Sequence, residues 1–253
     1  NLPINKIIKE LEVMGVTVDL NINVFEMEIP VQREIERIGN YYTVSFSPKI
    51  HSFKQIFFKR VMDIVGAIVG LLITGIVTVF LAPALLIESP GPLFFSQVRV
   101  GKNGRRFKIY KFRSMYMDAE ERKKELMSQN EMEGLMFKME NDPRVTKVGK
   151  FIRKTSIDEL PQFWNILKGE MSLVGTRPPT EDEFLQYEGY HRRRLNMTPG
   201  LTGLWQVSGR SDTKNFEEIV AMDVEYIDNW SLKEDIKILF KTVGVVLKGK
   251  GAS

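Results

Sequence analysis

Ile64–Ile87 reads IVGAIVGLLITGIVTVFLAPALLI, a run without a charged side chain that decides the fold. As a helix, it would be about 36 Å long at about 1.5 Å per residue, enough to cross the apolar interior of a bilayer. Its first part, Ile64–Ile73, is apolar on every helical face, and only a large core or lipid can cover such a surface. The alternative is the buried core helix of a soluble protein, but a membrane segment is the favoured interpretation.

Basic side chains lie on both flanks of this run, at Lys49, Lys54, Lys59 and Arg60 before it and at Arg99, Lys102, Arg105, Arg106, Lys108, Lys111 and Arg113 after it. Positive charge marks the cytoplasmic side of a membrane protein. A single spanning helix would leave one cluster outside, whereas a helix that enters, bends and returns keeps both inside. Thr74-Gly75 and Pro83 are candidate break points. We therefore expect a membrane re-entrant helical hairpin.

The composition narrows the chemistry open to this chain of 253 residues. It contains no cysteine, which excludes a disulfide framework, a thiol nucleophile and a thiolate metal site. Its two histidines, His51 and His191, lie far apart in the sequence, so a hard cation such as Mg²⁺ is a better candidate than zinc. The net charge of +4 suits anionic lipid, phosphate ligands and nucleic acid alike.

We expect an α+β protein in three parts. Residues 1–50 hold a helix-like segment at 4–14 and two strand-like segments, at 16–20 and 41–46, which together look like the tail of an α/β accessory domain. Residues 51–95 hold the linker and the membrane hairpin, and residues 96–253 form a compact cytosolic domain that carries the candidate site. The chain begins at Asn1 without a methionine or a signal peptide, which suggests a fragment of something longer.

The cytosolic domain is predicted to begin with a β-hairpin, in which the strand-like runs 93–101 and 106–113 are joined across a glycine-containing turn. Asp118 and Glu121 then cap a charged helix that extends to about Gln129. Near the C-terminus, apolar residues recur at helical spacing over 232–247, with lysines on the other faces. This amphipathic helix either packs on the core or lies on lipid headgroups, and the sequence leaves both open.

Two adjacent carboxylates, Asp158 and Glu159, precede the apolar run 163–167, which is typical of a helix start. Helix starts carry free N–H groups and a partial positive charge, so carboxylates there stay ionised and a phosphate can bind beside them. The alternative is a capping box, in which Ser156 and Glu159 bond to the backbone. That interpretation would place Pro161 where it deletes a hydrogen bond, whereas a helix that starts at Asp158 tolerates it in the first turn.

Four arginines, Arg113, Arg153, Arg177 and Arg210, each lie beside a turn or a helix start. The last two belong to loops rich in glycine and proline, and a polyanion pocket built from loops requires such arginines. Any one of them is more often an ordinary surface residue. Their repetition nevertheless favours a site that binds phosphate groups of a substrate.

Five short motifs follow the apolar run in a fixed order: Ser89–Pro92, Lys111–Met115, Asp158–Gln162, Gly175–Pro178 and Pro199–Gly203. This ordered set closely resembles the bacterial sugar transferase family, the monotopic phosphoglycosyl transferases. Within the family it looks most like the long polyprenyl-phosphate hexose-1-phosphate transferases that initiate capsular and exopolysaccharide synthesis. The resemblance covers about residues 55–248.

The resemblance implies an enzyme of the bacterial inner (plasma) membrane, with its catalytic domain facing the cytoplasm. It would move a hexose 1-phosphate from a UDP-sugar to a polyprenyl (undecaprenyl) phosphate, use Mg²⁺ and release UMP. By resemblance, Asp158 is the nucleophile of a ping-pong mechanism with an aspartyl phosphosugar intermediate, Glu159 assists with metal and proton, and both would hold the metal. Arg153 would contact a phosphate and Arg210 the nucleotide. Glucose and galactose are the leading candidates for the sugar, ahead of N-acetylated sugars.

Larger members of the family carry a Rossmann-like domain upstream, so residues 1–50 look like the end of that domain. The family's re-entrant helix is usually broken by a proline near its midpoint, whereas this chain has Thr74-Gly75-Ile76 there and Pro83 later, which leaves the position of the bend open. Membrane lipid is an expected partner, and a homo-oligomer stays open. The competing functions are a membrane-anchored nucleotide-binding regulator of polysaccharide assembly without catalysis, and a basic nucleic-acid module. The latter gives the apolar run no role, so no nucleic acid is expected.

Overall fold

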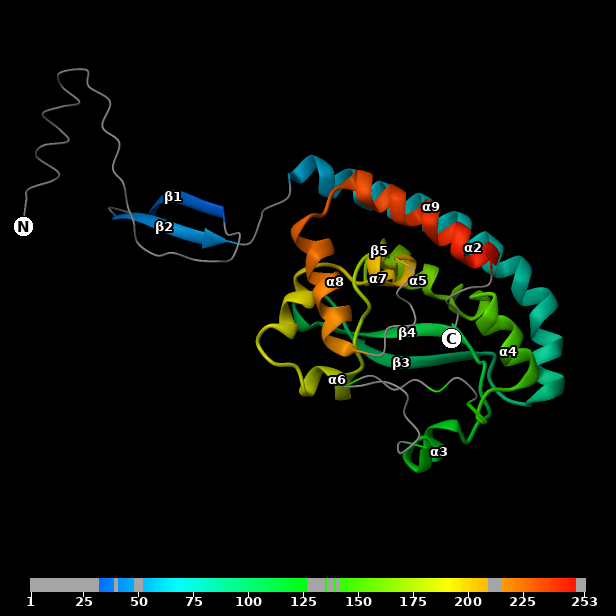
Figure 1. Cartoon of the computed structure of the whole chain (residues 1–253). Coiled ribbons are helices and arrows are strands. Elements are labelled where there is room, and N and C mark those ends of the chain that lie inside the picture. The colour runs from blue at the N-terminus through cyan, green and yellow to red at the C-terminus, as the bar shows by residue number, and fades with distance from the viewer. Residues whose placement is uncertain are drawn as a thin grey trace, which may run out of the picture. The chain divides into compact units, whose positions relative to one another are not determined.

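The computed structural model describes residues 32–38, 41–47, 52–126, 135, 139, 142–208 and 215–248 (Figure 1). Its internal contacts divide the chain into two units, residues 1–50 and 51–253. In the first unit, β1 (Gln32–Ile38) and β2 (Tyr41–Ser47) pair antiparallel. The strand expected at 41–46 is confirmed, whereas the helix and strand expected at 4–14 and 16–20 lie outside the described residues. A Rossmann-like origin of this unit stays a prediction.

The second unit mixes helices with two small sheets. In chain order its elements are α2 (Phe53–Glu88), β3 (Phe94–Val100), η1 (Lys102–Gly104), β4 (Arg106–Phe112), α3 (Ala119–Leu126), α4 (Lys147–Lys154), η3 (Ile157–Glu159), α5 (Gln162–Lys168), β5 (Ser172–Val174), α6 (Glu181–Leu185), η4 (His191–Asn196), β6 (Gly200–Thr202), α7 (Leu204–Val207), α8 (Phe216–Asp228) and α9 (Leu232–Lys248). β3 and β4 form the predicted antiparallel hairpin, and α9 confirms the C-terminal helix.

Helix α2 packs closely on the rest of the unit through its small residues. Ser52 caps its start, because the hydroxyl accepts a hydrogen bond from the Gln55 N–H at 3.3 Å. Further along, Gly66 lies against the Leu173 side chain and Gly70 against the ring of Phe163, and a Cβ at either glycine would overlap these side chains. The two glycines thus let the α2 backbone approach α5 and β5.

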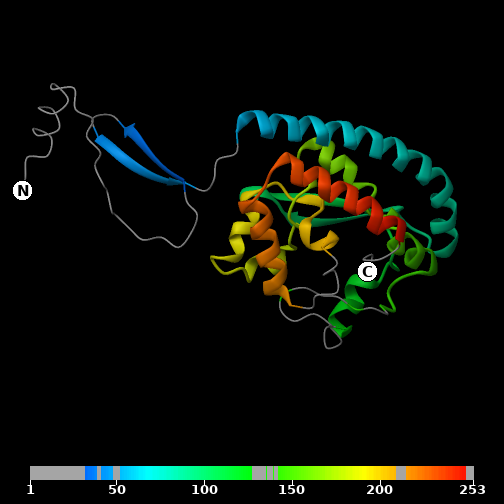
Figure 2. The same ribbon diagram turned by 45° about the horizontal axis from the view of Figure 1, so that its top comes forward.

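The uncharged run forms one continuous helix, so neither candidate break point, Thr74-Gly75 or Pro83, interrupts it. Figures 1 and 2 both show that α2 bends as it passes round the unit. The hydroxyls of Thr74 and Thr78 donate to carbonyls four residues earlier, at 2.7 and 2.6 Å, and such bonds often bend a helix. Pro83, inside the helix, removes a further backbone bond. The segment is therefore one bent helix, whereas a hairpin of two helices was expected. Its re-entry into a membrane stays a prediction.

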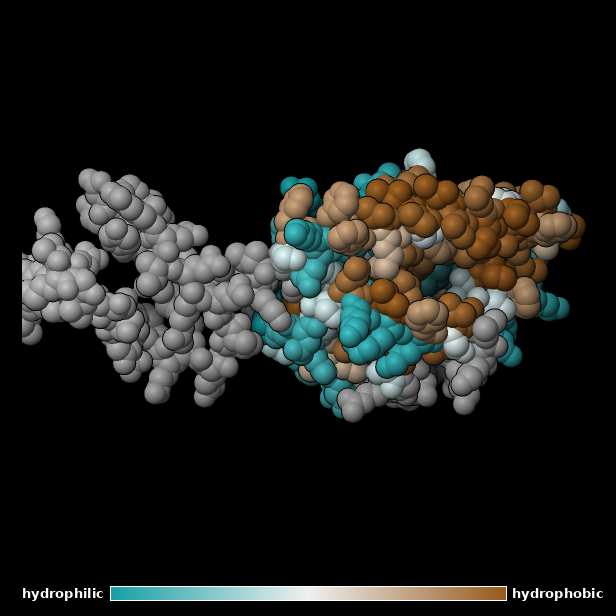
Figure 3. All heavy atoms as spheres, turned by 90° about the horizontal axis from the view of Figure 1, so that it is seen from above, coloured by the Kyte–Doolittle hydropathy of each residue, from teal (hydrophilic) through white to brown (hydrophobic). Residues whose placement is uncertain are grey.

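Helix α2 is long and apolar enough to cross a membrane, as judged by length and composition. Only 22% of its most apolar window is buried within the protein, which argues against the core helix of a soluble protein. Figure 3 shows the resulting broad apolar area on the upper face. One face of α9 packs on the core through the buried Ile238, while Phe240 and Val243 are exposed, and contact of this exposed face with lipid headgroups stays a prediction.

A buried ion pair joins the first turns of α2 to α9. The Lys59 ammonium donates to Asp235 Oδ2 at 2.6 Å and to the Val174 carbonyl at 2.9 Å. Asp235 also accepts from the Tyr226 hydroxyl at 2.7 Å and from the Trp230 indole N–H at 3.1 Å. Buried charges are tolerated when they are paired and hydrogen-bonded in this way. The pair therefore fixes α2, β5, α8 and α9 to one another.

The two loops rich in glycine and proline are more ordered than the sequence suggested. They contain β5 and β6, which pair in parallel with Ser172 opposite Gly200 and Val174 opposite Thr202. A Cβ at Gly175 would collide with the backbone around Gly200, so glycine is required for the two strands to approach. The pairing fixes the start of the loop that carries Arg177.

Candidate active site

The turn between α4 and α5 presents the two acidic residues. α4 ends at Lys154, the 3₁₀ turn η3 follows at Ile157–Glu159, and α5 begins at Gln162. Ser156 has φ 55° and ψ 17°, the left-handed region that residues other than glycine rarely adopt. Strained backbone of this kind is common at functional sites. The Ser156 side chain makes no capping bond, so the capping-box alternative is wrong.

Asp158 is buried, with only 8% of its surface exposed, yet lies among charges of both signs. Burial raises the pKa of its carboxyl from 3.8 to about 6, while Lys111 and Arg153 lower the pKa and Glu159 raises it. At neutral pH the group is therefore ionised but poorly solvated. A carboxylate that is short of solvent and close to the site of reaction is suited to act as a nucleophile.

Glu159 forms an ion pair with Lys111, with 2.7 Å between Oε1 and Nζ. Burial opposes its ionisation, but the Lys111 ammonium, the neighbouring Gln162 side chain and the charge of Arg177 hold the pKa of Glu159 below its usual range. The environments of the two neighbouring carboxyls thus push their pKa values apart. Such a difference allows adjacent acids to take different roles in catalysis.

The structure brings two of the four predicted arginines to the acidic pair. Arg153 is close enough to lower the pKa of Asp158, and Arg177 does the same for Glu159. Arg113 makes other contacts: its guanidinium donates to the carbonyls of Ser89 and Pro90 and so holds the chain where it leaves α2. Arg210 lies outside the described residues.

A buried network holds the backbone of Arg177 in place. Arg194 donates to the Arg177 carbonyl at 3.4 Å, to Asp223 Oδ2 at 2.8 Å and to the Tyr187 hydroxyl at 2.6 Å. The Arg177 side chain itself is 3.7 Å from Glu183 Oε1, a loose contact. The loop therefore presents a guanidinium from a fixed backbone, which is the arrangement that phosphate recognition requires.

Sequence reasoning missed Lys111 and Asn165, which both organise the acidic pair. The Asn165 side chain is fully buried, accepts from the Tyr110 N–H at 3.2 Å and donates to the Lys108 carbonyl at 2.6 Å. It thereby ties α5 to β4 and sets Lys111 opposite Glu159. A single polar residue in the apolar run 163–167 is the signal that could have indicated this role.

Arg99 is a further missed residue, next to the loop that carries Arg177. Its Nη1 donates to the Pro178 carbonyl at 3.1 Å and its Nη2 to Gln97 Oε1 at 2.8 Å, whereas no acceptor among the described residues reaches its buried Nε. Burial, reinforced by the like charge of Arg177, lowers the pKa of Arg99 to about 10. Its main partner lies 79 positions away in the sequence, so no local pattern could reveal it.

The acidic pair supplies donors that suit Mg²⁺, which prefers carboxylate and phosphate oxygens. Over the part of the chain that the structure describes, no group of three or more histidine, aspartate or glutamate side chains could hold a metal by itself. Two carboxylates beside Lys111, Arg153 and Arg177 therefore fit a cation shared with the phosphates of a substrate, and do not form a closed protein site.

Comparison with known proteins agrees with this geometry. The galactosyl transferase CpsE of Streptococcus agalactiae is 53% identical over 249 residues, which cover 98% of this chain and 55% of that protein. The undecaprenyl-phosphate galactose phosphotransferase of Salmonella typhimurium is 46% identical over 200 residues, 78% of this chain and 42% of that protein. The UDP-glucose:undecaprenyl-phosphate glucose-1-phosphate transferase of Escherichia coli is 44% identical over 193 residues, 73% of this chain and 39% of that protein. The chain thus spans about half the length of these relatives, or less.

The family model described as bacterial sugar transferase matches residues 54–249. This match begins at the start of α2, includes the acidic pair and both arginine-bearing loops, and ends just beyond α9. The chain belongs to the bacterial sugar transferase family.

Proposed function

We propose that the protein transfers a hexose 1-phosphate from a UDP-sugar to undecaprenyl phosphate and releases UMP, as the first membrane step of capsular or exopolysaccharide synthesis. The observation that carries this proposal is the buried, charged Asp158 beside Glu159, with Lys111, Arg153 and Arg177 around them. Galactose is the first choice of sugar and glucose the second, because similar proteins are named for these two hexoses.

In the first step, a carboxylate oxygen of Asp158 attacks the phosphorus that carries the sugar. The new O–P bond gives an aspartyl phosphosugar, while the bond from this phosphorus to the bridging oxygen breaks and UMP leaves with that oxygen and its electron pair. Arg153 and Arg177 bind the negative charge of the diphosphate. Although the pKa of Asp158 is raised, it stays below neutral pH, so the carboxyl is ionised and able to attack.

In the second step, an oxygen of the lipid phosphate attacks the same phosphorus. The acyl phosphate bond breaks, Asp158 leaves as a carboxylate, and the sugar 1-phosphate is joined to the lipid phosphate. Glu159, kept ionised by Lys111, accepts the proton that the attacking phosphate carries. The two steps give ping-pong kinetics.

Asp158 and Glu159 would hold Mg²⁺ together with phosphate oxygens of the donor. When bound, the ion would neutralise part of the diphosphate charge. Lys111 pairs with Oε1 of Glu159 in the described structure, and the other carboxylate oxygen would face the ion.

We further propose that α2 enters the membrane from the cytoplasmic side and returns to it. The bend of α2, its exposed apolar surface and the basic residues at both flanks support this arrangement. It would keep Asp158 on the side where nucleotide sugars are made. Exposed apolar residues of α9 would then lie on the same lipid surface.

The test uses the full chain in lipid nanodiscs with UDP-galactose, UDP-glucose and their N-acetylated analogues. We expect UMP release and, without lipid acceptor, a protein adduct with the mass of one hexose phosphate. Asp158→Asn should abolish both, whereas Asp182→Asn, which removes an exposed carboxylate, should change neither. Binding of a UDP-sugar without UMP release or adduct would overturn the proposal and favour a nucleotide-binding regulator.

A further inference from the structure

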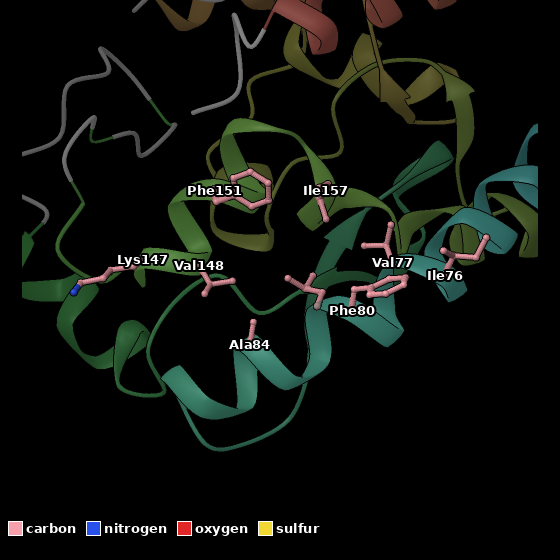
Figure 4. Close-up of a pocket in the computed structure, with 9 residues that line it drawn as sticks. Ile76, Val77, Phe80, Ala84, Lys147, Val148, Phe151 and Ile157 are labelled. Carbon is pink, nitrogen blue, oxygen red and sulfur yellow. The ribbon is translucent and has the colours of Figure 1, made fainter.

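An apolar groove lies beside the acidic pair, between the second half of α2 and the segment formed by α4 and η3 (Figure 4). Its volume is about 600 Å³, within the range of roughly 300–1,000 Å³ typical of ligand sites. Ile76, Phe80 and Ala84 of α2 form one wall, and Val148, Phe151 and Ile157 the other. Nothing in the two proposed steps requires this groove to bind the nucleotide or the sugar.

The lining restricts the class of ligand. Eight of the nine residues around the groove are apolar, and the remaining one, Lys147, lies at one end with its nitrogen pointing away from the walls (Figure 4). Sugars and nucleotides need polar groups for orientation, and this lining offers none between its ends. A branched or linear hydrocarbon chain fits the surface.

The position of the groove connects it to the reaction. Ile157, which lines the wall opposite α2, is the residue immediately before Asp158 in the turn η3. Neighbouring Cα atoms are about 3.8 Å apart, so the backbone of the proposed nucleophile adjoins this wall of the groove. A chain in the groove would thus place its own phosphate where the second step needs it.

The open side of the groove faces the same environment as α2. Phe80 and Phe151, on opposite walls, are 77% and 60% exposed, and Ile76 at the rim is exposed as well. These side chains continue the exposed apolar surface of α2 that we propose lies in lipid. A lipid chain could therefore enter sideways from the bilayer, without passing through water.

Charge favours an anionic head group. α4 carries four basic residues, Lys147, Lys150, Arg153 and Lys154, and no acidic one. A surface with one sign of charge attracts ligands of the opposite sign and orients them. An apolar groove with a basic helix along it, next to the turn that carries the proposed nucleophile, suits a lipid phosphate.

We propose that this groove binds the isoprene units next to the phosphate of the polyprenyl phosphate acceptor, an inference that rests on the proposed function and assigns its second substrate a place. The groove fixes the lipid so that its phosphate meets the phosphosugar on Asp158. Bulk phospholipid also carries hydrocarbon chains, and the test below distinguishes its binding from that of polyprenyl phosphate.

The experiment separates the two half-reactions of the full chain in nanodiscs. Ala84→Trp fills the groove, and Val79→Trp adds the same ring to the same helix at a 70% exposed position that does not line the groove. Single-turnover UMP release without acceptor should be unchanged in both variants, which also shows that they are folded. Ala84→Trp should raise the KM for polyprenyl phosphate at least about tenfold, because losing contact with about two methylene groups already corresponds to that factor. Val79→Trp should leave this KM within about twofold of the wild type.

A second measurement does not depend on activity or on Ala84. A photo-crosslinking amino acid in place of Phe151 should label polyprenyl phosphate, and excess unlabelled polyprenyl phosphate should compete while phosphatidylglycerol should not. The same amino acid in place of Val79 should give no competed labelling. Equal competition by phosphatidylglycerol, or an unchanged KM in Ala84→Trp with normal UMP release, would overturn the groove assignment alone. Absence of UMP release from the wild type would instead overturn the proposed function.

Discussion

Replacing the proposed nucleophile by its amide, Asp158→Asn, should make the protein more stable at neutral pH even though it abolishes turnover. Asp158 is 8% exposed, and burial raises the pKa of its carboxyl from 3.8 to about 6. The folded wild-type protein is therefore less stable with Asp158 ionised than it would be with Asp158 protonated. Asparagine has nearly the same shape and no charge to desolvate.

The magnitude follows from the pKa shift. A rise from 3.8 to about 6 is about two pKa units, which at about 1.4 kcal/mol per unit corresponds to roughly 3 kcal/mol. The pKa of Asp158 is higher in the folded state than in the unfolded state. Below about pH 4 the carboxyl is protonated in both states, so its burial does not lower the free energy of unfolding there. The wild type loses this free energy of unfolding as the pH rises towards 6, and the loss is complete above that pH.

The assay is thermal unfolding of matched wild-type and variant samples in one detergent with EDTA, from pH 4 to pH 8. At pH 4 the two melting temperatures should agree, and at pH 8 Asp158→Asn should melt about 6–12 °C higher, as expected for roughly 3 kcal/mol in a protein of this size. The control Asp182→Asn removes an exposed carboxylate and should show no such pH-dependent gain. A variant that melts below the wild type at pH 8, or a difference that does not vary with pH, would refute the reasoning.

Three further changes test other parts of the structure. Lys111→Met removes a positive charge that lowers the pKa of Asp158, so the acid limb of the kcat/KM profile for UMP release should move from near pH 6 to higher pH, while Lys111→Arg should leave it in place. Asp235→Leu leaves Lys59 buried without its partner and should lower the free energy of unfolding by about 3–5 kcal/mol in denaturant titrations, and a loss below about 1 kcal/mol would contradict the role given to this pair. Lys54→Cys and Lys102→Cys, made singly in this cysteine-free chain, should both be protected from an impermeant thiol reagent in intact cells; labelling of one with protection of the other would exclude re-entry.

Several predictions from sequence concerned local or periodic features, and these are confirmed. The apolar run is helical, the strands around Gly101–Gly104 form a hairpin, and the amphipathic C-terminal run is α9. Each depends on interactions within a few residues or on the spacing of apolar side chains. Both can be recognised in the amino-acid sequence alone. The family was likewise predictable, because each of its motifs is a short continuous stretch and their order is a property of the chain.

The shape of α2 was not predictable in the same way. Thr74 and Pro83 were candidate break points, yet the helix continues through both and only bends. The Thr74 hydroxyl lies 2.7 Å from the Gly70 carbonyl and 3.2 Å from that of Leu160, so packing on the acidic turn supports the helix at this point. Whether a weak point becomes a break depends on such distant contacts, which local sequence patterns do not contain.

The sequence by itself determined which side chains could carry chemistry, the carboxylates Asp158 and Glu159 and arginines beside turns and helix starts. It predicted that the helix begins at Asp158, whereas the structure holds both carboxylates in the 3₁₀ turn η3 and begins α5 at Gln162. The tertiary structure decided how they are used. It placed Lys111 against Glu159 across 48 positions of sequence, directed Arg113 to the backbone at the end of α2, and buried Asp158 far enough to raise its pKa to about 6. The physical reason is that pKa values and ion pairs depend on distance and solvent access in space, and residues far apart along the chain set both.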